Sequence, residues 1–96
     1  MSVDQVRLEE FKKMVENNRA LIVQANGGEK VQVCKCINPN QLEHLSWMLD
    51  EAIYMFEVDT NVAKANHWLG YVQGVLSAKY GVSLDALKDA NRIQDD

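Results

Sequence analysis

Two cysteines and two histidines are the side chains in this sequence that could bind a metal ion. Cys34 and Cys36 flank Lys35; seven residues then precede His44, and 22 more precede His67. Two thiolates and two imidazoles form a donor set that suits tetrahedral zinc. This spacing matches no zinc motif, and an N-terminus without the apolar core of an export signal leads us to expect reduced thiols. We therefore predict structural cysteines, with no metal and no cofactor.

The carboxylates offer little for catalysis. Asp50 and Glu51 are adjacent on an expected helix, so their side chains point in different directions. The sequence contains no nucleophile elbow, phosphate-binding loop or dinucleotide fingerprint. We therefore expect a protein that is not an enzyme.

Acidic residues are concentrated in one segment. The formal net charge is −4, which gives no general electrostatic argument for binding nucleic acid. Residues 37–63 hold five acidic side chains and no Lys or Arg. No apolar run approaches the ~20 residues of a membrane span, so we expect a cytoplasmic protein. A nucleic-acid binder is the weakest alternative, and it would use the basic residues of the N-terminal part: Lys12, Lys13, Arg19, Lys30 and Lys35.

Hydrophobic periodicity predicts one mainly α-helical domain of the α+β class. An apolar stripe at helical spacing marks an N-terminal helix, and the two asparagines at 17 and 18 are expected to end it. The expected order is a helix in residues 1–18, a β-hairpin in 19–37, an antiparallel helical hairpin in 38–81, a short helix in 82–92 and a frayed tail in 93–96.

The β-hairpin is predicted from two β-prone runs that flank Asn-Gly-Gly at residues 26–28. A three-residue loop sets Val23 opposite Val31 and Leu21 opposite Val33, which gathers four apolar side chains on one face. Such a face needs helices, or strands of another copy, to cover it.

Glycines interrupt the third helix, expected at about 61–79. Each interior glycine costs a helix ~1 kcal/mol relative to alanine, so something is expected to approach this side closely. The covering element could be the chain's own first helix or β-hairpin, a second copy, or a ligand against bare backbone. The small or bare stripe that we expect in close packing comprises Ala63, His67, Gly70, Gly74 and Ala78.

The second helix carries large aromatic residues among carboxylates on its outer side. Trp and Tyr are enriched at the energetic centres of protein interfaces, so this side is a candidate partner-binding patch. The alternative is that the β-hairpin or the last helix covers it. The expected partner-binding residues are Trp47, Tyr54, Glu43, Asp50 and Glu51.

One family resemblance can be stated from these segments. The stretch His67–Leu76, followed by Gly81–Asp85 and Ala90–Arg92, resembles small uncharacterised accessory proteins of tailed phages and prophages of enteric bacteria, and Gln41–Ala52 is similar to the helix that precedes this motif in them. The resemblance implies a phage protein that acts in the host cytoplasm and binds, inhibits or redirects a host protein, including defence proteins.

The sequence therefore predicts a non-enzymatic binding protein that forms a homo-oligomer and binds a host protein. A competing hypothesis is a protein that sequesters a small ligand or cyclic nucleotide, with a pocket between subunits near Gly70, Gly74 and His67.

Overall fold

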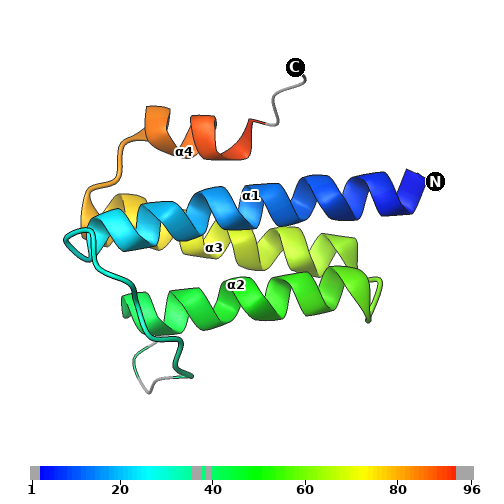
Figure 1. The fold of residues 1–96 in the computed structure, drawn as a ribbon, viewed down its shortest axis with the longest axis horizontal. Helices are drawn as coiled ribbons and strands as arrows, with labels where there is room; N and C mark the ends of the chain where they lie inside the picture. Colours follow the sequence, from blue (N-terminus) through cyan, green and yellow to red (C-terminus); the bar gives the residue numbers. More distant parts are fainter. Residues whose placement is uncertain (1–2, 36–37, 39, 93–96) are drawn as a thin grey trace.

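The chain is a helical bundle in the computed structural model, which describes residues 3–35, 38 and 40–92. Helices α1, α2 and α3 pack on one another, and α4 lies against α1 on the side away from α2 (Figure 1). The described residues form four helices: α1 (Val3–Ala25), α2 (Leu42–Glu57), α3 (Val62–Tyr80) and α4 (Leu84–Asn91).

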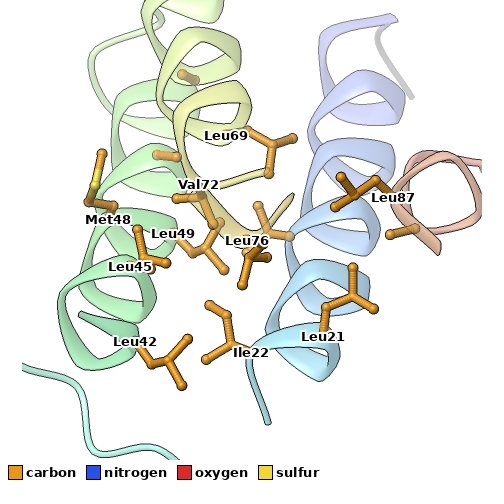
Figure 2. Packing of buried hydrophobic residues seen from close by; sticks show 14 of the residues in the cluster. Leu21, Ile22, Leu42, Leu45, Met48, Leu49, Leu69, Val72, Leu76 and Leu87 are labelled. Carbon is orange, nitrogen blue, oxygen red and sulfur yellow. The ribbon is translucent and has the colours of Figure 1, made fainter. Parts of the chain in front are cut away.

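One apolar core lies between the three long helices. Leu45 and Leu49 of α2 meet Val72 and Leu76 of α3, and Ile22 of α1 closes the space between them (Figure 2). All five side chains are fully buried. Each contributes roughly 1.5–3 kcal/mol to folding by leaving water, so this packing fixes which sides of α2 and α3 remain outside.

The expected α+β class is wrong, because the described residues contain no strand and therefore no β-hairpin. Residues 19–25 continue α1 instead of forming a first strand. Extending an existing helix adds one hydrogen bond per residue without a new nucleation step, and Ile22 becomes fully buried. A separate hairpin would have needed other elements to cover its apolar face.

Asn18 is the reason that the continuation of α1 was not recognised. It is fully buried and lies on the same helical stripe as Phe11, Val15 and Ile22. Its Nδ2 donates to the Met14 carbonyl at 2.7 Å, and its Oδ1 accepts from Gln73 Nε2 of α3 at 3.2 Å. An asparagine with satisfied hydrogen bonds can occupy a core position, so the residue predicted to stop the helix lies in its interior.

The glycine pair after α1 does adopt positive φ, but at the end of a helix. Gly27 and Gly28 have φ of 75° and 88°, and the Gly28 N–H donates to the Val23 carbonyl at 2.9 Å. The following residues run extended towards the start of α2, where the Cys34 N–H donates to the Glu43 carbonyl at 3.2 Å.

The two predicted cross-strand pairs are absent, and their apolar residues have separate places. Val31 is buried in the core and Val33 is 44% exposed. Leu21 is buried within α1. The residues expected to share one face of a hairpin therefore serve a helix, the core and the surface.

Polar contacts hold α4 in place. Asn17 Nδ2 donates to the Ala90 carbonyl at 3.1 Å, and Gln73 of α3 donates to Asn91 Oδ1 as well as to Asn18. Ser83 Oγ accepts from the Ala86 N–H at 3.1 Å and caps the helix, as its position before the helix indicates. The predicted tail at 93–96 lies outside the described residues.

We expect Asn18→Ala to lower the free energy of unfolding by about 1–3 kcal/mol, because it removes two buried hydrogen bonds and leaves a small cavity. Asn66→Ala is the matched control. Its Nδ2 also donates to the carbonyl four residues earlier, at 2.9 Å, but the residue is exposed on α3. Its effect should stay within about 0.5 kcal/mol. Urea denaturation followed by circular dichroism measures both, and equal effects would contradict a special role for Asn18.

Candidate functional site

Two half-buried tryptophans, one from α2 and one from α3, meet where both pack against the apolar core. The ring centroids of Trp47 and Trp68 lie 5.8 Å apart, and the His44 ring lies 5.2 Å from that of Trp47. Lys35 places its Nζ 5.2 Å from the Trp47 centroid, which is within the range of a cation–π contact. We call His44, Trp47 and Trp68 the aromatic seam; all three are half-buried.

The seam exists because α2 and α3 are neighbours that run antiparallel. Asn61 begins α3 after a short connection, and its Oδ1 accepts from the Lys64 N–H at 3.1 Å. At the other end, Tyr71 and Tyr80 of α3 donate their hydroxyls to the side chain and the carbonyl of Asn40, at 2.7 and 2.9 Å. These bonds tie the start of α2 to α3 and so fix the level at which the two helices face each other.

The small stripe of α3 is uncovered in the single chain. Ideal Cβ atoms placed on Gly70 and Gly74 meet no atom of the described residues within 4 Å. Packing among the described residues therefore does not explain the glycines. We call the stripe the α3 face; all five of its residues are exposed: Ala63, His67, Gly70, Gly74 and Ala78.

Two shallow depressions lie beside the α3 face, and one of them reaches Trp68 of the aromatic seam. One is lined by His67, Gly70 and Tyr71 and opens widely to solvent. The other, equally open, is lined by Asn61, Ala63, Lys64, His67 and Trp68. His67 borders both, so the seam and the α3 face form one continuous surface.

The expected partner-binding patch on α2 is only partly free. Tyr54 is 52% exposed, whereas Trp47 belongs to the aromatic seam. Asp50 Oδ1 accepts from Arg19 Nη2 at 2.7 Å, so its charge is already balanced by α1. Glu43 and Glu51 are half-buried and form no ion pair within the described part of the chain.

Charge divides cleanly between these two helices. Helix α2 contains Glu and Asp but no Lys or Arg, and α3 contains Lys64 and Lys79 but no acidic residue. One continuous surface therefore has an acidic, aromatic side and a basic side with small residues.

Sequence reasoning missed three residues of this surface. It gave no surface role to Trp68, which packs against the apolar core and also lines this site, or to Tyr71 and Lys64. Their helical positions beside His67 were the available signal, but only the antiparallel contact with Trp47 brings them into the same site.

Metal binding gains no support from the geometry. Among the described residues, no three His, Cys, Asp or Glu side chains come together as a metal site. His44 packs beside Trp47, His67 lines the depression beside Trp68, and Cys34 is exposed. Cys36 lies outside the described residues.

Comparison of the chain with protein-family models, with curated proteins and with solved structures finds no match. In the part of the chain that the structure describes, no helix has both the length and the apolar character to cross a membrane.

Because nothing covers the α3 face, we expect Gly74→Ala to raise the free energy of unfolding by about 0.5–1 kcal/mol through helix propensity alone. Gly81→Ala should lower it by about 1 kcal/mol, because Gly81 ends α3 with a φ of 70°, where a Cβ is strained. Thermal and urea denaturation at low protein concentration test both. A loss of stability in Gly74→Ala would mean that the chain itself packs on the α3 face.

Proposed function

We propose that this protein is a non-enzymatic helical binding protein that acts by contact between the outer surface of α2–α3 and another protein. The observation that carries the proposal is the bare α3 face at Gly70 and Gly74, next to exposed Tyr54 and the half-buried aromatic seam. Interior glycines destabilise a solvated helix, so their presence on an uncovered side is economical only when a partner covers it.

The shape of the surface favours a protein partner over a small molecule. Pockets for small ligands bury most of the ligand, whereas the two depressions beside His67 are open and shallow. The imidazoles of His44 and His67 have no hydrogen-bonded carboxylate among the described residues, so the general-base arrangement expected of a catalytic histidine lacks support. A sequestering function would require a second subunit to close the pocket.

The resemblance to phage accessory proteins suggests where this protein would act and what kind of partner it would bind. A phage-type accessory protein would act in the host cytoplasm and bind or inhibit a host protein, including one used in defence. The acidic side chains Glu43 and Glu51 favour a partner with a basic surface. The nucleic-acid alternative is less well supported, because Lys12 Nζ lies 3.5 Å from Glu57 Oε2 and Arg19 pairs with Asp50.

We expect Tyr54→Ala to reduce the capture of a host protein from an enteric bacterial lysate by at least about tenfold, because Tyr54 is the most exposed aromatic side chain on this surface. Leu84→Ala on α4 is the control, since Leu84 is 67% exposed but lies on another helix. Immobilised protein followed by mass spectrometry provides the measurement. Capture of the same proteins at equal yield by wild type, Tyr54→Ala and Leu84→Ala would refute a partner site at Tyr54.

A further inference from the structure

The charge division between α2 and α3 specifies what a partner for this surface should look like. A helix that lies on the α3 face should bring acidic side chains, because Lys64 is exposed there and α3 has no acid. A helix that lies on α2 should bring basic side chains, because Glu43 and Glu51 have no ion pair in the described residues. A partner for this surface should therefore carry basic side chains opposite α2 and acidic side chains opposite α3.

The two helices are also complementary in the size of their outward-facing side chains. The α3 face offers little apolar area of its own, because two of its five residues lack a side chain. Association in water is driven by buried apolar area, so the partner must supply large side chains. Exposed Tyr54 and half-buried Trp47, beside which Lys35 lies, are such side chains, and both stand on the acidic helix.

These requirements are met by the chain itself. We propose that a second copy of this protein docks on the surface as a two-fold dimer, with α2 of each copy antiparallel to α3 of the other. Each half of the contact then pairs an acidic helix bearing aromatic residues with a basic helix bearing small residues, and the symmetry repeats the pairing. The inference rests on the proposed function, since it names a second copy as an occupant of the same binding surface, which a host protein would bind only by displacing that copy.

The register of the dimer follows from the contact inside one copy. Trp47 meets Trp68, and the helices are antiparallel, so Glu51, one turn further along α2, lies level with Lys64, one turn back along α3. Rotation about a two-fold axis parallel to the helices leaves the height of every residue along the helices unchanged. It places Glu51 of one copy opposite Lys64 of the other, twice in the dimer, with Trp47 over the bare backbone at Gly70.

Two charge reversals test this arrangement against every other. Glu51→Lys and Lys64→Glu each create two like-charge pairs in the dimer, so each should raise the dimer dissociation constant by about tenfold or more at low salt. In an equimolar mixture, a mixed dimer regains opposite charges at both contacts. The mixture should therefore associate about as tightly as wild type. Light scattering over a dilution series measures the mass against twice the chain mass of 10.9 kDa, and circular dichroism checks that each variant is folded.

Glu10→Lys and Lys13→Glu on α1 are the matched controls, because both residues are exposed and lie outside this surface. They should leave the dimer unchanged, alone and mixed. Gly74→Leu, whose side chain meets open space in the single chain, should give a folded monomer.

A wild-type protein that stays monomeric up to about 1 mM would overturn the dimer. So would folded Glu51→Lys and Lys64→Glu proteins that fail to associate when mixed, or a dimer insensitive to both. The outcome is separable from the proposed function. If the protein is a monomer that still captures a host protein through Tyr54, only the dimer proposal is refuted. If it is a dimer that captures no host protein, only the proposed host partner is refuted.

Discussion

The burial of one side of α2 and one side of α3 against α1 is the constraint on which the rest of the structure depends. Leu45, Leu49, Val72 and Leu76 are fully buried in this contact, so the opposite sides of both helices must face outward. The aromatic seam and the α3 face are what remains outside. The candidate surface thus follows from core packing, and the segment before α2 adds Lys35 beside Trp47 and Asn40 as a partner of Tyr71 and Tyr80.

Parts of this structure could be predicted because their signals are local. The stop at Gly81 and the cap at Ser83 depend on residues next to the helix ends, and the structure contains both. The bare face at Gly70 and Gly74 was also recognisable as unusual, since glycine inside a helix requires a reason. The sequence leaves open which element covers it, and in the described part of the chain no element lies against it.

The errors arose where a distant contact decides the local structure. Asparagines at 17 and 18 are typical of a helix end, and only Gln73 of α3 makes Asn18 acceptable inside the bundle. Once α1 was ended too early, the run from Leu21 to Val23 was interpreted as a strand, and Val31 was paired with it. Trp68 packs against the core and also lines the candidate surface, and this second role follows only from its contact with Trp47 on another helix.

Asn18 also has a consequence for the uniqueness of the fold. With leucine at this position, α1 would present an unbroken apolar stripe, and such a stripe can slide along its neighbours by one heptad at little cost in contacts. A buried amide that must meet Gln73 penalises every shifted alignment, since the displaced amide would lie unsatisfied among apolar side chains. Asn18 therefore adds to the ion pair of Arg19 with Asp50 and the hydrogen bond of Asn17 to Ala90 in favouring one alignment of α1.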